Sequence, residues 1–389
     1  MNPNPPSRTR LPFRRPSPRR ATARRGRPGG LPRFMTGSAR DAINLRWNYK
    51  DAINLATGEW TRAGYRAPAC YVTNASPLVK ATFSVAPTNL PAVRLFAETA
   101  AAIGGFAITN VSFSNGAASN VVLSTRSATT NCVLKETFDL TWKAVVSNET
   151  EIVTNILGKT DGHVFYTILG EPKLPWTDSI VTNQNVWVSV LDFLSESNRC
   201  LGATTTDVAL KRLTEYLFAD HGLIYDTFSG GSAYIKFRSW DDASFRIDSY
   251  MTKNRGIVVN CYDQACSLAV LGRSLGLDAI LVYMEPFGYI QETSLVGGLR
   301  SNNPFFSNPR HDFHAVCPTN SPKRSGFRKH MFVTQGGMAF DACSGPVTGQ
   351  WTRVEYIEHV IDTNRVSTCY PTGTDADANP YLGIREVIE

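Results

Sequence analysis

Residues 255 to 279 read Arg-Gly-Ile-Val-Val-Asn-Cys-Tyr-Asp-Gln-Ala-Cys-Ser-Leu-Ala-Val-Leu-Gly-Arg-Ser-Leu-Gly-Leu-Asp-Ala. The apolar run Ile257–Val259 is typical of a strand and stops at Asn260. A helical pattern follows at once, with apolar residues at helical spacing and Gly276 where a helix would end. The stretch therefore predicts a strand that passes directly into a helix, with Cys261 in the first turn.

Cys261 is placed where a cysteine can become a nucleophile. The unpaired N–H groups and the positive dipole end of a helix N-terminus favour a thiolate. A thiolate attacks carbonyl carbon readily at neutral pH, so the position indicates covalent acyl transfer. Taken alone, Cys261 would be better explained as a buried packing residue. The hypothesis therefore needs a base and a group that orients the base.

A hairpin further along the chain supplies both groups. The pair Gly336–Gly337 between two apolar runs predicts a two-residue hairpin loop, in which Gln335 faces Met338. In that register His330 and Asp341 are diagonal neighbours on one face of the sheet, about 7 Å apart at the backbone. The carboxylate can then hold the imidazole in one tautomer and stabilise its charged form. A three-residue loop would instead place the two residues on opposite faces.

The segment from Cys261 resembles the transglutaminase-like superfamily of papain-like cysteine enzymes. In that family the cysteine at a helix start is followed by Asp at +2, Ala at +4, Arg at +12 and Leu-Gly at +14 and +15. This chain carries the same residues at those offsets: Asp263, Ala265, Arg273, Leu275 and Gly276. The resemblance covers about residues 190 to 350. It implies an acyl-transfer enzyme whose catalytic residues are Cys261, His330 and Asp341.

The histidine motif departs from the family pattern, which often reads His-Ala-Trp. Here His330 precedes Met-Phe, whereas the run Phe-His314-Ala-Val is closer to the motif, so His314 is an alternative base. His330 is favoured because its geometry with Asp341 follows from a single hairpin. Trp240 precedes the nucleophile strand, and the resemblance allows an aromatic donor there to support an oxyanion. The other interpretation of Trp240 is an ordinary core residue.

Composition divides the chain into parts. Residues 1–34 hold ten Arg, eight Pro and no Asp or Glu, so removing them changes the net charge from +7 to −3 (+7 − 10). Such a tail is expected to be disordered, and any nucleic-acid binding is expected only through it. The prediction is an α+β chain with these parts: a disordered basic tail (1–34), an antiparallel β-sandwich domain (35–170), a linker (171–190), a transglutaminase-like domain (191–365) and a C-terminal extension (366–389).

Eight cysteines and no visible secretory signal leave disulfides unassigned. A zinc site would need Cys261, Cys266, Cys317 and Cys343, but the first pair is widely spaced and no second tight pair exists, so no metal or other cofactor is expected. No apolar run is long enough for a membrane-spanning helix.

Two functions follow from these observations. The preferred one is a cysteine-dependent enzyme that acts on protein or peptide amides through a thioester, as a peptidase, deamidase or transglutaminase. The alternative is a non-catalytic interaction or scaffold protein with a degenerate transglutaminase-like domain. In either case the β-sandwich is expected to bind a partner or to act as a scaffold.

Overall fold

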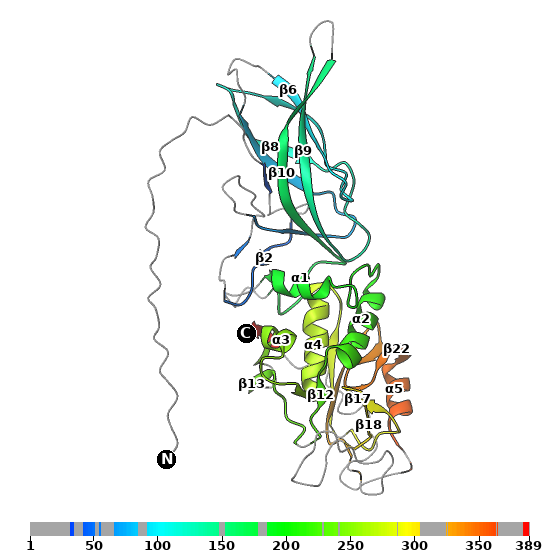
Figure 1. Cartoon of the computed structure of the whole chain (residues 1–389). Coiled ribbons are helices and arrows are strands. Elements are labelled where there is room, and N and C mark those ends of the chain that lie inside the picture. The colour runs from blue at the N-terminus through cyan, green and yellow to red at the C-terminus, as the bar shows by residue number, and fades with distance from the viewer. Residues whose placement is uncertain are drawn as a thin grey trace, which may run out of the picture.

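The computed structural model describes the following residues: 32–34, 42–50, 54–55, 66–84, 92–147, 152–177, 185–227, 229–239, 242–285, 287–303, 324, 326–362, 364 and 384–388. They form an upper lobe of strands and a lower lobe of helices and sheets, which makes the chain mixed α+β (Figure 1).

The upper lobe is a β-sandwich of two sheets. One sheet has the order β1-β5-β8 and the other the order β4-β10-β9-β6-β7. The strands are β1 (Pro32–Phe34), β4 (Ala69–Val72), β5 (Leu78–Ser84), β6 (Ala92–Glu98), β7 (Phe106–Ser112), β8 (Ala117–Ser124), β9 (Leu134–Ser147) and β10 (Ile152–Ile168).

Side chains from both sheets fill the core of the sandwich. Phe83 of β5 packs edge-on against Trp142 of β9, with ring centroids 5.6 Å apart. Along β9, Phe138, Leu140 and Trp142 are buried and the residues between them are more exposed, as the period-two pattern predicts. The pairing differs from the antiparallel expectation at one place, because β4 runs parallel to β10.

The lower lobe is built around helix α4 (Cys261–Ser274) and an antiparallel sheet of order β16-β19-β20-β22. The sheet strands are β16 (Ile280–Met284), β19 (His330–Gln335), β20 (Met338–Asp341) and β22 (Val347–Thr352). Helix α2 (Thr206–Glu215) continues as a π-helical turn, η1 (Tyr216–Asp220).

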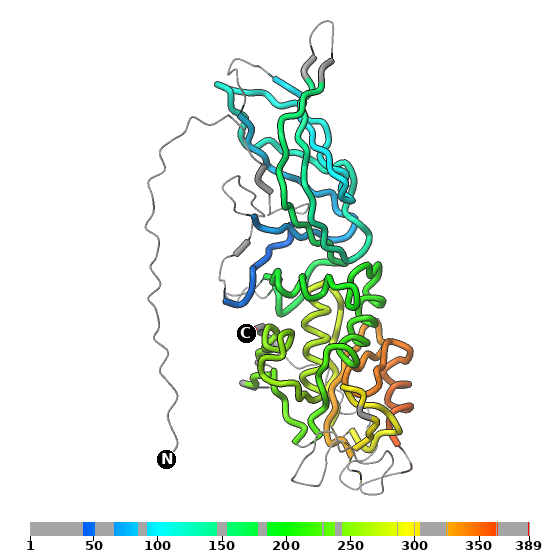
Figure 2. Tube along the Cα trace, viewed as in Figure 1, coloured from blue at the N-terminus to red at the C-terminus, as the bar shows by residue number. Residues whose placement is uncertain are grey.

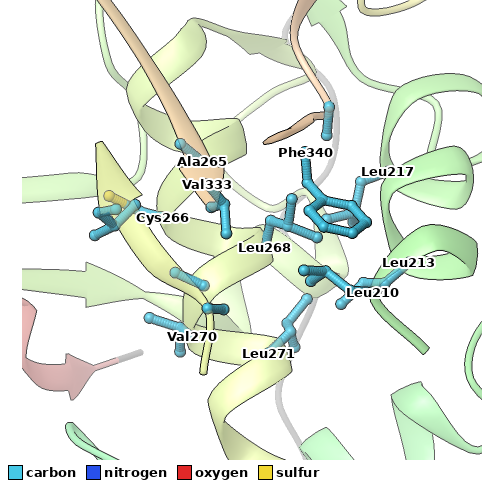
Figure 3. Packing of buried hydrophobic residues seen from close by; sticks show 14 of the residues in the cluster. Leu210, Leu213, Leu217, Ala265, Cys266, Leu268, Val270, Leu271, Val333 and Phe340 are labelled. Atoms are coloured by element: carbon cyan, nitrogen blue, oxygen red, sulfur yellow. The ribbon is translucent and has the colours of Figure 1, made fainter. Parts of the chain in front are cut away.

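One apolar stripe joins the helices to the sheet. Figure 3 shows Leu210, Leu213 and Leu217 facing Leu268 of α4 and Phe340 of β20. All five side chains are buried. The i, i+3, i+7 spacing of the three leucines puts them on one face of the α2–η1 helix, and that face therefore packs on the core that supports Cys261.

The remaining elements complete the lower lobe: α1 (Val188–Leu194), α3 (Ile247–Thr252), α5 (Arg353–Val360), β2 (Leu45–Arg46), β3 (Asn54–Leu55), β11 (Val186–Trp187), β12 (Ile224–Tyr225), β13 (Ile235–Ser239), β14 (Asp242–Arg246), β15 (Val258–Val259), β17 (Ser294–Leu295), β18 (Leu299–Arg300), β21 (Ser344–Gly345) and β23 (Ile384–Ile388). No helix among the described residues is both long and apolar enough to cross a membrane.

The predicted linker 171–190 is partly built into the lower lobe. Trp176 and Trp187 are almost fully buried, and Nε1 of Trp176 donates to the carbonyl of Val270 in α4 at 2.8 Å. Residues 186–190 belong to β11 and α1, so only part of the segment lacks regular structure. The two prolines favour an irregular linker, but burial of the two indole side chains stabilises this segment against the lower lobe.

The predicted domain limits also shift at both ends. Leu45 is expected in the sandwich domain, but it packs in the core of the lower lobe because β2 pairs with β11. Figure 2 shows the segment that carries β2, in blue, beside the lower lobe. Strand β1 pairs with β5 and removes Pro32–Phe34 from the expected tail, whose residues 1–31 lie outside the described part. Strand β23 pairs with β14, so part of the predicted extension is a sheet strand.

Candidate active site

Cys261 is the first residue of α4, immediately after β15. Asn260 caps the helix: its Oδ1 accepts from the backbone N–H of Tyr262 (3.0 Å) and of Asp263 (3.1 Å). Its Nδ2 donates to the carbonyl of Gly230 at 2.7 Å. These bonds fix the first turn and leave the N–H of Cys261 outside the cap, so it can serve a ligand at the helix N-terminus.

Asp263, the +2 residue of the family pattern, has a structural role in this chain. Its buried carboxylate accepts from the Ser232 hydroxyl (2.7 Å) and from the backbone N–H of Ala233 and Tyr234 (2.9 Å each). Burial raises the pKa of this carboxyl, and the hydrogen bonds oppose that rise. Asp263 therefore ties the loop before β13 to the first turn of α4.

The predicted hairpin register is confirmed for the paired strands β19 and β20. Gln335 pairs with Met338, and the pairing continues to Val333 and Phe340. Gly336 and Gly337 have φ values of 56° and 82°, the two positive angles that a type I′ turn requires.

The hairpin brings His330 and Asp341 into direct contact. Nε2 of His330 lies 2.7 Å from Oδ2 of Asp341, and both side chains are about 1% exposed. Oδ1 of Asp341 accepts from the backbone N–H of Cys343 (2.7 Å) and Ser344 (3.1 Å). The hydroxyl of Tyr356 donates to Oδ2 at 2.6 Å. Four groups thus contact the carboxylate and fix its orientation.

The surroundings of His330 favour its charged form. Burial opposes a charge on the imidazole, but the adjacent Asp341 carboxylate and the nearby Cys261 thiol outweigh burial and raise the pKa of His330 to about 10. Nδ1 of His330 is buried and has no hydrogen-bond partner among the described residues. With Nε2 held by Asp341, Nδ1 is the ring nitrogen available to exchange a proton with Cys261 or a substrate.

Cys261 is reached through a small cleft. It is 5% exposed and lines a cavity of about 150 Å³. The other lining residues are three aromatic side chains, two cations and the cap region: Tyr225, Tyr262, Phe327, Arg328, Lys329, Gly230 and Asn260. This is a mainly apolar opening with a few polar groups at its edge.

Two predicted residues lie outside the described part of the chain, namely the alternative base His314 and the oxyanion candidate Trp240. Cys266 is fully buried on α4 and Cys343 is fully buried beside Asp341. Cys317, the fourth member of the zinc set, also lies outside the described part. Among the described residues no three His, Cys, Asp or Glu side chains gather as a metal site would need.

The sequence did not point to two tyrosines that the fold brings to the site. Tyr225 comes from β12, which pairs with β15, and it lines the cleft beside Cys261. Burial raises the pKa of Tyr225, and the neighbouring Cys261 raises it further. Tyr356 comes from α5, whose start could have been recognised from the capping-box pair Thr352 and Glu355.

Comparisons with known proteins leave the family open. No family model matches the chain, and no curated protein matches its sequence. The crystal structure of red sea bream transglutaminase is similar with a TM-score of 0.38 and 12% identity, covering 74% of this chain. The similarity spans 52% of that transglutaminase. A TM-score of 0.38 does not establish a shared fold, so membership of the transglutaminase-like superfamily stays a prediction.

Proposed function

We propose that this chain is a cysteine-dependent acyl-transfer enzyme that acts on protein or peptide amides, with Cys261 as nucleophile, His330 as acid and base, and Asp341 as the orienting carboxylate. One observation carries the proposal: the 2.7 Å contact between His330 Nε2 and Asp341 Oδ2, which leaves a buried, unpartnered Nδ1 beside a cysteine at a helix start. Most buried polar side-chain atoms have a hydrogen-bond partner.

The first half-reaction forms a thioester. Nδ1 of the His330 imidazolium holds the proton of the Cys261–His330 pair, and the Cys261 thiolate attacks the amide carbonyl carbon. The oxyanion that develops accepts from the N–H of Cys261, and the Tyr225 hydroxyl in the cleft is the candidate second donor. The His330 imidazolium then protonates the leaving nitrogen. The C–N bond breaks and the amine departs.

The second half-reaction releases the acyl group. His330, now neutral, takes a proton from water or from an amine, which attacks the thioester carbonyl carbon. The C–S bond breaks with its electron pair on sulfur, and His330 keeps the proton taken from the acceptor, which restores the thiolate and the imidazolium. Water as acceptor gives hydrolysis or deamidation, and an amine gives a new amide. Three assays separate these outcomes on glutamine-containing peptides: cleavage, ammonia release and incorporation of a fluorescent amine.

Thiol labelling tests the proposal without knowledge of the substrate. Wild-type protein is treated with iodoacetamide at pH 6–7, and each cysteine is followed by mass spectrometry. Cys132 is half-buried and Cys261 almost fully buried, so accessibility alone predicts faster labelling of Cys132. We expect Cys261 to react faster by about tenfold or more because it forms a thiolate.

Two variants complete this test. His330→Ala should slow the labelling of Cys261 and leave Cys132 unchanged. The outcome that rejects the enzyme, and supports the scaffold alternative, is labelling of Cys261 no faster than that of Cys132. Cys261→Ser identifies the labelled peptide and should abolish any turnover.

A further inference from the structure

Tyr356 is held rigidly beside the His330–Asp341 pair. The capping box of α5 fixes the start of the helix: Thr352 N donates to Glu355 Oε2 at 2.8 Å, and Glu355 N donates to Thr352 Oγ1 at 3.3 Å. The phenol ring packs edge-on against Phe332 of β19, with centroids 4.8 Å apart, and it is fully buried. The ring is buried, its helix start is fixed by the capping box, and one side of it packs on Phe332, so the side chain has little rotamer freedom.

The Tyr356 hydroxyl competes with His330 for one oxygen atom. It lies 2.6 Å from Oδ2 of Asp341 and 3.3 Å from Nε2 of His330. The same Oδ2 is 2.7 Å from His330 Nε2. The other oxygen, Oδ1, is already occupied by two backbone N–H groups. The phenol is therefore the one side-chain donor besides the imidazole that the described residues present to this carboxylate.

We propose that Tyr356 is a positioning residue of the site: by sharing Oδ2 of Asp341 with His330, its hydroxyl fixes the carboxylate and limits how tightly that carboxylate holds the imidazolium. This inference rests on the proposed function, because it concerns the same three residues. It adds a fourth member, supplied by α5, whose role is to keep the proton on His330 transferable.

The reason lies in what an acid catalyst must do. His330 has to give a proton to the leaving nitrogen. An imidazolium that a carboxylate stabilises too strongly donates that proton slowly. A hydroxyl that donates to the same carboxylate oxygen stabilises part of its charge, and this weakens the interaction between the carboxylate and the imidazolium. The groups facing the imidazole are Asp341, Cys261, Tyr356 and the rings of three phenylalanines: Phe287, Phe327 and Phe332.

The test follows the proton on His330 directly. The protein is labelled with ¹⁵N-histidine, which gives signals from only six residues, and is titrated by NMR. Tyr356→Phe removes the hydroxyl and keeps the ring that packs on Phe332. We expect the titration midpoint of His330 to rise by about half a pH unit or more, since the carboxylate loses a competing donor. The rate of ammonia release from a glutamine-containing peptide should fall about tenfold, and the KM for that peptide should change little.

A second replacement predicts the opposite sign. Site-specific 3-fluorotyrosine at position 356 has a more acidic hydroxyl and is a stronger donor, so the midpoint of His330 should fall. The matched control is Tyr216→Phe, which removes another buried hydroxyl 3.3 Å from a different histidine, His221. It should leave the His330 titration unchanged. Thermal unfolding confirms that each variant is folded.

The outcomes separate the two proposals. Unchanged midpoints in both Tyr356 replacements, or a shift of equal size in Tyr216→Phe, overturn the role of Tyr356 even when Cys261 labels rapidly. Slow labelling of wild-type Cys261 overturns the enzyme itself, whatever the titrations show. Opposite shifts from the two replacements support the shared carboxylate oxygen, because a merely structural tyrosine would not produce them.

Discussion

The imidazole of His330 and the carboxylate of Asp341 come from two strands joined by a two-residue turn, and their Nε2 and Oδ2 atoms lie 2.7 Å apart in the protein interior. Their contact is therefore a local consequence of a Gly-Gly hairpin. The residues around this pair come from other parts of the chain: α4 brings Cys261 and α5 brings Tyr356.

Asp341→Asn should preserve the shape of the site and remove its charge. An amide cannot stabilise the imidazolium and can select the wrong tautomer of His330. We expect iodoacetamide labelling of Cys261 at pH 6 to slow by about a hundredfold. The control is Asp192→Asn, since that residue pairs with Lys135 and the Tyr166 hydroxyl away from the site. Equal labelling rates in the two variants would contradict the role of Asp341.

The stability of the fold should depend on pH through His330. Asp341 and Cys261, working against burial, raise the pKa of this histidine from the ordinary 6.5 to about 10. A raised pKa means that the stabilisation is fully present below pH 6.5 and is lost as pH rises through 10. The difference in unfolding free energy between wild type and His330→Gln should shrink over this window by an amount on the order of a few kcal/mol. Urea unfolding at several pH values measures it, and a constant difference would exclude the charged pair.

Asn260→Ala should affect both stability and the reactivity of Cys261. The variant loses the cap of α4 and the bond to Gly230, which should cost about 1–2 kcal/mol. Labelling of Cys261 should slow as well, because its turn is no longer fixed. Thr205→Ala removes the cap of α2, where Thr205 accepts from Val208 N, and serves as the control. It should lower stability similarly and leave labelling unchanged. Loss of reactivity in both variants would assign the effect to general destabilisation.

The cleft beside Cys261 should favour anionic reagents. Arg328 and Lys329 both line it and share one carboxylate, Glu285, at 3.2 and 3.4 Å, so a positive charge remains at the rim. We expect the ratio of iodoacetate to iodoacetamide labelling rates at Cys261 to fall about threefold to tenfold in the Arg328→Ala, Lys329→Ala double variant. Lys211→Ala removes a charge from the exposed side of α2 and should not change the ratio. An unchanged ratio in the double variant would rule out steering by these two cations.

Gly276→Ala should weaken the joint between the lobes. Gly276 has φ of 89°, and an added Cβ would lie 2.4 Å from the backbone of Gly170, on the segment that leaves β10. Backbone strain and the clash together should cost about 2 kcal/mol or more. Gly298→Ala separates the two effects, because Gly298 has φ of 76° and nothing within 4 Å of its added Cβ. Comparable losses in both variants, measured by urea unfolding, would remove the clash from the explanation.

Short-range features of this chain could be predicted because short-range chemistry decides them. A strand that stops at an Asn cap fixes the start of α4, and Gly276 with its left-handed φ follows the end of that helix. The register of β19 and β20 follows from a two-residue turn with positive φ angles, which Gly-Gly adopts without strain. His330 and Asp341 could be paired from sequence for this reason.

Long-range packing decided the rest. Trp176 and Trp187 lie in a stretch whose prolines indicate a linker, and only the core that they fill gives them a fixed place. Strands β2 and β23 join sheets of the lower lobe through partners far away in sequence. Tyr225 and Tyr356 reach the site because their elements pair with, or pack on, those that carry Cys261 and His330.

The sequence by itself determined the strand–turn–helix around Cys261 and the hairpin that joins an imidazole to a carboxylate, because caps and turns depend on a few neighbouring residues. Only the tertiary structure decided that this thiol and this imidazole share one buried site, with a phenol from α5 on the same carboxylate oxygen. Burial of apolar surface brings such distant elements together, and it is non-directional, so no local pattern specifies the partners.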